Sequence, residues 1–241
     1  MSHLQSKRPA VAMIELIFAL VIMGIVMMSA PTLIATASKS GFATTQQEAI
    51  SIAASQVNMI MGYSWDENDA NNSYIAPLLH VSSGDSDLDE YGTTSRRIGT
   101  PKESPHSFLR SDGLEFNATA SSNFGAGKDT GETSTADNDD IDDFSANTTT
   151  LILIETSAAD VTDRTLTMDS NISYMSDTAS YNTNSITFNA DTTTVADTSN
   201  IKHIKVTLTS DSGVKELSKK IILHAFSCNI GAYTLEEREV N

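Results

Sequence analysis

The chain opens with an almost wholly apolar block, since residues 11–30 contain a single charged side chain, Glu15. As a helix rising about 1.5 Å per residue, this block would extend roughly 30 Å, the thickness of a bilayer's hydrocarbon core. Lys7 and Arg8 precede it, and positively charged flanks favour the cytoplasmic side, so the chain after Pro31 is predicted to be exported. A carboxylate inside a membrane helix costs about 2.5–3.5 kcal/mol, so Glu15 calls for a partner or a function.

After Pro31 the pattern becomes amphipathic. Apolar residues recur mostly at spacings of three and four, which indicates a helix with one apolar stripe, and Gly62 is a plausible stop. The two halves together predict a helix of about 50 residues, kinked or bent near Pro31. The stripe consists of Phe42, Ala49, Ile50, Ala53, Val57 and Ile60.

A polar region follows, and strand patterns return near Thr150. Residues 70–149 are rich in Asp, Asn, Ser, Thr and Gly, and a run of this length is typical of a functional or partly disordered loop. Residues 201–209 alternate apolar and polar positions and form the clearest strand. Residues 210–213 form a turn, so 217–226 returns as the second strand of an antiparallel hairpin. Shorter strands are predicted at 151–155, 165–168, 171–175 and 185–188.

The start of the chain resembles type IV pilins and type II secretion pseudopilins. Precursors in that family carry a short basic leader, a cleavage point and a hydrophobic helix with Glu as its fifth residue. Here Val11 would be the first mature residue and Glu15 the fifth. Ala10 stands where the family usually has Gly, and Val11 where it usually has Phe. Pro31 matches a helix-kinking proline that many members carry, and the resemblance covers roughly residues 1–60.

The resemblance implies a structural subunit, either a minor pilin or a pseudopilin. Prepilin peptidase would cleave between Ala10 and Val11, Val11 would be methylated, and Glu15 would act in assembly with other subunits. The implied location is the bacterial inner membrane, crossed once with the C-terminal domain in the periplasm, and then a periplasmic or extracellular filament. Residues 140–144 and Trp65-Asp66-Glu67 are also similar to minor pilins of the mannose-sensitive-haemagglutinin type.

Pattern and resemblance together predict an α+β, pilin-like fold, in which a long N-terminal helix packs on a C-terminal antiparallel sheet. The expected divisions are a leader (1–10), a membrane-spanning or filament-core helix (11–31), its amphipathic continuation (32–64), a polar acidic loop region (65–149) and a sheet region (150–241).

Two other interpretations of the apolar block stay open. An ordinary secretory signal would be cut at Ala35-Thr36-Ala37, although such signals have a hydrophobic region of about 7–15 residues and this one is longer and contains an acid. A plain membrane anchor would keep Met1. The corresponding alternative function is a membrane-anchored, calcium-dependent adhesion or binding module.

Composition narrows the function further. The formal net charge of −16 argues against nucleic acid and anionic lipid headgroups as partners. Cys228 is the only cysteine, so no internal disulfide can form. The five histidines are scattered, and Gly125-Ala126-Gly127-Lys128 lacks the rest of a phosphate-binding loop, so we expect no enzyme.

Two acidic clusters are candidate calcium sites, because calcium binds several oxygen ligands at once. The first alternates Asp85, Asp87 and Asp89 like the start of an EF-hand loop. Glu90 then replaces the turn glycine, and Arg96 replaces the bidentate Glu. The second cluster is the favoured one because it adjoins the sheet. The alternative for both is a solvated acidic loop without metal. The second cluster consists of Asp137, Asp139, Asp140, Asp142 and Asp143.

Overall fold

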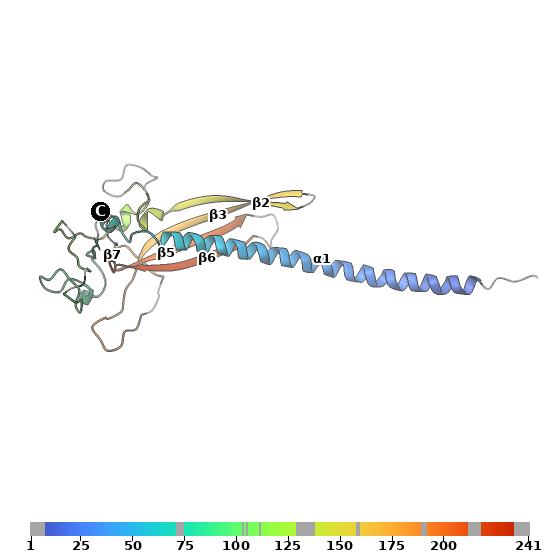
Figure 1. Ribbon diagram of the computed structural model, residues 1–241, viewed down its shortest axis with the longest axis horizontal. Helices are drawn as coiled ribbons and strands as arrows, with labels where there is room; N and C mark the ends of the chain where they lie inside the picture. The colour runs from blue at the N-terminus through green and yellow to red at the C-terminus, as the bar shows by residue number, and fades with distance from the viewer. Residues whose placement is uncertain are drawn as a thin grey trace, which may run out of the picture. The chain divides into compact units, whose positions relative to one another are not determined.

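A computed structural model describes residues 8–70, 75–102, 104, 106–110, 112–128, 138–157, 160–188, 192–211 and 218–233. The chain divides into two compact units, Met1–Glu48 and Ala49–Asn241. Figure 1 shows the one long helix and the antiparallel sheet. The predicted α+β layout is therefore confirmed at the level of its elements.

The long helix α1 runs from Arg8 to Ile60 without interruption. Pro31 lies inside it, although its ring removes a backbone donor. Close to the proline, the Ser29 and Thr32 hydroxyls donate to the carbonyls of Val26 and Ser29, at 3.1 and 2.6 Å. The helix ends two residues before the predicted stop, and the Gly62 N–H donates to Met59 O at 3.0 Å.

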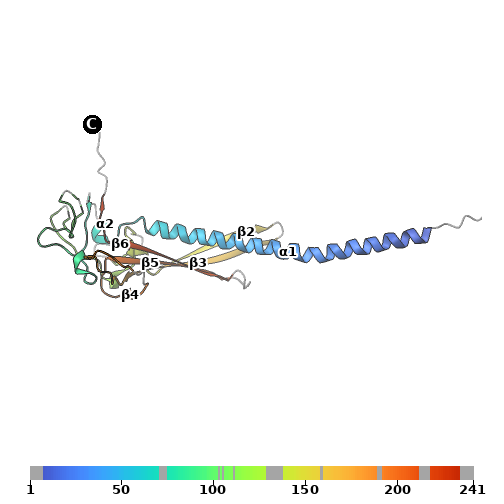
Figure 2. The same cartoon turned by 90° about the horizontal axis from the view of Figure 1, so that it is seen from below.

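The main sheet consists of β2 (Asn147–Ser157), β3 (Asp160–Met175), β5 (Ile201–Asp211) and β6 (Lys220–Cys228), antiparallel in that order. A short strand, β4 (Thr194–Val195), pairs with the end of β3. Strands β1 (Ile75–Ala76) and β7 (Ala232–Tyr233) form a separate pair. Figure 2 shows the same strands after a quarter turn.

The sheet differs from the expectation in three places. β2 begins at Asn147, inside the predicted loop region, and residues 185–188 are not a strand. The two segments predicted at 165–168 and 171–175 are one strand, β3. Ser170 between them is only 3% exposed, so the alternation of buried positions continues through it from Leu166 to Tyr174. The predicted pairing of the two C-terminal strands is confirmed as β5 and β6, with Leu208 opposite Ile221. Of the predicted turn, Ser210 and Asp211 belong to β5, and residues 212–213 lie outside the described residues.

One hydrophobic core joins the end of α1 to the sheet. Four of the six residues of the predicted stripe are buried in the same cluster as residues of β3 and β5: Ala49, Ala53, Val57 and Ile60. Phe42 is half-buried and Ile50 is 42% exposed. The β5 members of the core are Ile204, Val206 and Leu208.

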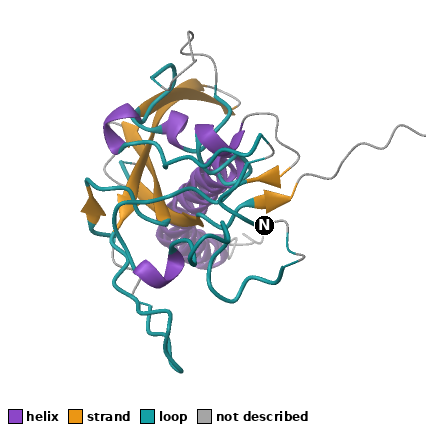
Figure 3. Cartoon of the chain, turned by 90° about the vertical axis from the view of Figure 1, so that its left-hand side faces the viewer, coloured by secondary structure: helices purple, strands orange, loops and turns teal. Residues whose placement is uncertain are grey.

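The region between α1 and β2 consists mostly of loops, which are held by hydrogen bonds from polar side chains. It contains the short helices α2 (Glu67–Ala70), η1 (Ser86–Leu88), η2 (Ser121–Asn123) and η3 (Asp142–Phe144), and Figure 3 shows how much of one face is loop. The side-chain amide of Asn229 donates to Leu79 O at 2.7 Å and accepts from Leu79 N at 3.1 Å. Arg97 donates to Leu88 O, Asn229 O and Asn200 Oδ1, each at 2.6 Å. These contacts hold the loops to the C-terminal part of the chain without a disulfide.

We expect Ile60→Ala to lower the free energy of unfolding by about 2–5 kcal/mol, because it leaves a cavity where α1 meets the sheet. Met59 is the matched control, since it precedes Ile60 and is 43% exposed. Met59→Ala should change the stability by about 0.5 kcal/mol or less. Urea unfolding of the detergent-solubilised full chain measures both, and equal losses would contradict the packing.

Candidate functional site

The first candidate site is the apolar part of α1. Fifteen large apolar side chains between residues 13 and 34 are each 53–82% exposed, around the whole helix. The helix is long and apolar enough to cross a membrane. Glu15 is exposed among these side chains, and Ala10 and Val11 lie in the first turns of α1. An apolar surface of this extent requires lipid or an apolar protein surface to cover it.

The second candidate site is buried beneath the sheet and centres on Lys202. The ammonium nitrogen Nζ lies 2.6 Å from Trp65 O, 3.0 Å from Asp66 Oδ2 and 2.6 Å from Asp142 Oδ2. Lys202 is fully buried, as are the side chains of both acids. We call the group formed by Lys202, Asp66, Asp69, Asp140 and Asp142 the Lys202 cluster.

Aromatic rings complete the surroundings of this ammonium. Nζ lies 4.4 Å from the ring centre of Trp65, 5.1 Å from that of Phe124 and 5.8 Å from that of Tyr174. A buried cation loses its hydration, and here two carboxylates, one carbonyl and three ring faces replace the lost water.

The acidic box at residues 140–144 enters the core because its apolar members anchor it there. Ile141 is 1% exposed and Phe144 4%, and Ile141 N donates to Ser64 O at 2.9 Å. Between these anchors, Asp140 Oδ1 accepts the N–H of Asp142 at 2.7 Å. Both acids are completely buried, so the solvated-loop interpretation is wrong for them.

Burial raises the pKa of both Asp140 and Asp142, so this pair of carboxyls favours holding a proton. Burial, followed by the neighbouring charge of Asp142, raises the pKa of Asp140 to about 10. Asp140 Oδ2 and Asp142 Oδ1 meet no N–H donor among the described residues. A proton on one carboxyl would let the two groups share the hydrogen bond that these oxygens lack.

Asp66 is the better-satisfied acid of the cluster. Its carboxylate accepts the Thr119 N–H at 2.9 Å, the Thr119 hydroxyl at 3.0 Å and the Asn68 N–H at 3.2 Å. Asp69 lies next to it and accepts the Asp66 N–H at 3.2 Å. Burial raises the pKa of Asp69 to about 7.

The first acidic cluster is a surface turn. Asp85 caps η1, accepting the Asp87 N–H at 3.0 Å, and also accepts the Tyr181 N–H at 2.7 Å. These two hydrogen bonds hold the pKa of Asp85 below its usual value. Asp89 follows η1, and its N–H donates to Ser86 O. In the second cluster, Asp139 is exposed and Asp137 lies outside the described residues.

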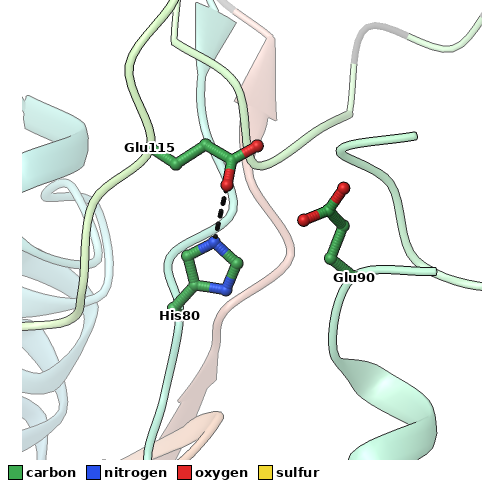
Figure 4. A group of neighbouring side chains, drawn as sticks. All are labelled: His80, Glu90 and Glu115. Carbon is green, nitrogen blue, oxygen red and sulfur yellow. Dashed lines mark hydrogen bonds and ion pairs between the residues drawn. The ribbon is translucent and has the colours of Figure 1, made fainter. Parts of the chain in front are cut away.

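The described residues bring three ligand-type side chains together at a different place, shown in Figure 4. His80 Nε2 lies 3.1 Å from Glu115 Oε2, and with Glu90 the three ligand atoms lie within 4.8 Å of one another. The His80 ring stacks on Phe108 at 4.5 Å between centroids. An imidazole with two carboxylates is a set that zinc accepts, although tetrahedral bonds of about 2.1 Å would require Glu90 to move inward.

Lys202 was not singled out from the sequence, although a signal was present. It precedes Ile204, Val206 and Leu208 in the two-residue period of β5, so it falls on the core face of that strand. A lysine on the core face of a strand requires buried acids as partners. The acidic box at residues 140–144 directly precedes the first strand of the main sheet and could provide them.

Comparison with known proteins finds no matching family model, curated protein or solved structure. The function is therefore argued from the chain's own residues.

Stability should depend on pH through Asp69. Its pKa in the folded protein, about 7, lies above the 3.8 of an ordinary aspartate, so between these values the folded state binds the extra proton. The contribution of Asp69 is therefore fully present below pH 3.8 and falls by about 1.4 kcal/mol per pH unit as the pH rises through the window. Urea unfolding of the wild type and Asp69→Asn from pH 4 to 8 measures this. The free energy of unfolding of Asp69→Asn should rise relative to that of the wild type as the pH increases to about 7. A difference between the two that does not change with pH would contradict the assignment.

Asp66→Asn should be strongly destabilising, because it removes the negative charge that faces Lys202. It also replaces one carboxylate oxygen with an NH₂ group, which would face the donors of Thr119, Asn68 or Lys202. We expect a loss of about 3 kcal/mol or more in the free energy of unfolding. Asp197→Asn is the control, since Asp197 is an exposed aspartate of the same unit. Similar values for the two variants would mean that the Lys202 cluster does not contribute as described.

Proposed function

We propose that this chain is a structural subunit of a type IV pilus or type II secretion filament, a minor pilin or pseudopilin. The observation that carries the proposal is the first part of α1, which exposes apolar side chains on all sides and contains one acid, Glu15. The same helix continues into a stripe that is buried against the sheet. Such a helix can stay in the membrane before assembly and pack against equivalent helices afterwards.

The position of Glu15 favours a helix bundle over a plain anchor. In an apolar setting its carboxylate requires a cation, and in the described part of α1 the nearest one along the sequence is Arg8, almost two turns away. Cleavage before Val11 would create an amine four residues from Glu15, and a neighbouring subunit would bring a second one. A charged hydrogen bond between subunits in apolar surroundings would favour one axial register.

The remaining chain fits an exported subunit. Lys7 and Arg8 favour a cytoplasmic N-terminus, which puts the acidic unit that follows on the other side of the membrane. Ala10 and Val11 occupy the predicted cleavage point. The single cysteine is compatible with an oxidising compartment, since it offers no internal disulfide to mispair.

Glu15→Leu should retain or strengthen membrane insertion, but reduce recovery of the protein in sheared filament fractions by about tenfold or more. A tenfold loss corresponds to only about 1.4 kcal/mol per assembly step. Glu15→Gln, which keeps the shape and removes the charge, should behave like Glu15→Leu. Ser29→Leu is the control, because it also makes the block more apolar while keeping the acid.

If Glu15→Leu enters filaments as well as the wild type does, the carboxylate does not set register, and an anchored binding module becomes the better interpretation. Mass spectrometry of the mature N-terminus adds an independent readout. An N-methylated Val11 supports the proposal, whereas Ser38 indicates an ordinary secreted protein and Met1 a plain anchor.

A further inference from the structure

Lys202 and Asp142 are held in a short contact that is sealed from solvent. Their Nζ and Oδ2 atoms lie 2.6 Å apart, and both side chains are 0% exposed. The residues come from distant parts of the sequence, η3 and β5, and pack into one sealed site. We propose that Lys202 and Asp142 condense into an intramolecular amide bond, which cross-links η3 to β5 in the mature protein.

The site meets the first requirement for such a reaction, which is fixed proximity of amine and carboxyl. Lys202 Nζ is held from a second side by Trp65 O at 2.6 Å and from a third by Asp66 at 3.0 Å. The rings of Trp65, Phe124 and Tyr174 fill the remaining directions. Groups held in this way react as one molecule, with an effective concentration far above that of free amine and acid in solution.

Asp142 is the carboxyl that reacts, and Asp66 is not, because their hydrogen bonds differ. The Asp66 carboxylate accepts two N–H groups and the Thr119 hydroxyl, so attack at its carbon would disrupt three hydrogen bonds. Asp142 Oδ1 meets no N–H donor among the described residues. It faces the Asp140 carboxyl, which carries a proton because burial raises its pKa to about 10. A protonated neighbour activates the Asp142 carboxyl for attack.

The reaction balances without any co-reactant. The Lys202 ammonium passes one proton to the Asp66 carboxylate, since the ion pairs raise the pKa of Lys202 and the amine must be freed first. Asp140 gives its proton to Asp142, and Nζ attacks Cγ of Asp142. The C–N bond forms, the amine's second proton returns Asp140 to its protonated form, and the proton held by Asp66 passes to the departing hydroxyl. The C–O bond breaks and one water leaves, so ammonium and carboxylate have become amide and water.

Burial also favours the product over the ion pair. The reaction replaces the buried Lys202–Asp142 charge pair with one neutral amide, and the anion that remains, Asp66, keeps its hydrogen bonds from Thr119 and Asn68. Each polar atom of the amide has a partner in the present geometry. The N–H can donate to Trp65 O, and the carbonyl oxygen can accept from Asp140.

Tryptic mapping of the full chain, purified in detergent and denatured, tests the proposal. An amide at Nζ blocks cleavage after Lys202, so residues 129–164 and 165–205 should appear as one branched peptide, lighter by one water than the sum of its parts. Fragmentation should place the branch at Asp142. Recovery of residues 165–202 and 203–205 as separate peptides in full yield would overturn the cross-link. A branch to residues 40–96, which contain Asp66, would overturn the assignment to Asp142.

Variants separate the chemistry from folding. Asp140→Asn keeps the volume but removes the shuttled proton, so the branched peptide should form about a hundredfold more slowly or not at all in freshly made protein. Lys205→Arg is the control, since it changes the next lysine of the same strand while leaving Lys202 in place, and the branch should form at the wild-type rate. Equal branching in Asp140→Asn and the wild type would refute the role of Asp140. None of these readouts depends on filament assembly, so this proposal and the proposed function can fail separately.

Discussion

The positive charge that Lys202 carries while the chain folds is the constraint on which the described unit depends. One ammonium contacts the segment that leaves α1, through Trp65 and Asp66, and the acidic box, through Asp142, from its own place on β5. Removing a charge from water in this way is costly, and only matched acids in good geometry repay the cost. Three segments that are far apart in the sequence must therefore meet at one point, which fixes where the helix ends on the sheet and how the loops before β2 enter the core.

The same constraint explains how a chain with few aromatic residues and no disulfide keeps an ordered interior. Aromatic residues make up 6% of the sequence, and three of them surround Lys202. Away from that point, side-chain amides and guanidinium groups hold the loops. Asn229 acts on both backbone groups of Leu79, and Arg97 binds three acceptors. The loops are thus organised by polar contacts that composition alone does not reveal.

Periodicity made the long helix and the C-terminal hairpin predictable, because each buries one face in a regular pattern. The α1 stripe from Ala49 to Ile60 and the β5 positions from Ile204 to Leu208 were visible in the sequence for this reason. The length of β3 was not, since Ser170 in its middle is buried without being apolar. The burial of the acidic box could not be deduced from its charge, because Asp140 and Asp142 are buried next to a lysine about 60 residues later in the sequence. The local sequence of an acidic segment does not show whether its carboxylates face solvent or pair with a buried cation far away in the sequence.

The connection between α1 and β5 also determines how the unit would bear mechanical load. A pull on α1 reaches the end of the helix at Ile60, and within a few residues the chain is tied through Trp65 and Asp66 to Lys202 on β5. β5 is paired along most of its length with β3 on one side and β6 on the other. Tension would therefore pass from a single helix into two hydrogen-bonded ladders at once, and many backbone hydrogen bonds would share it before any strand could peel away.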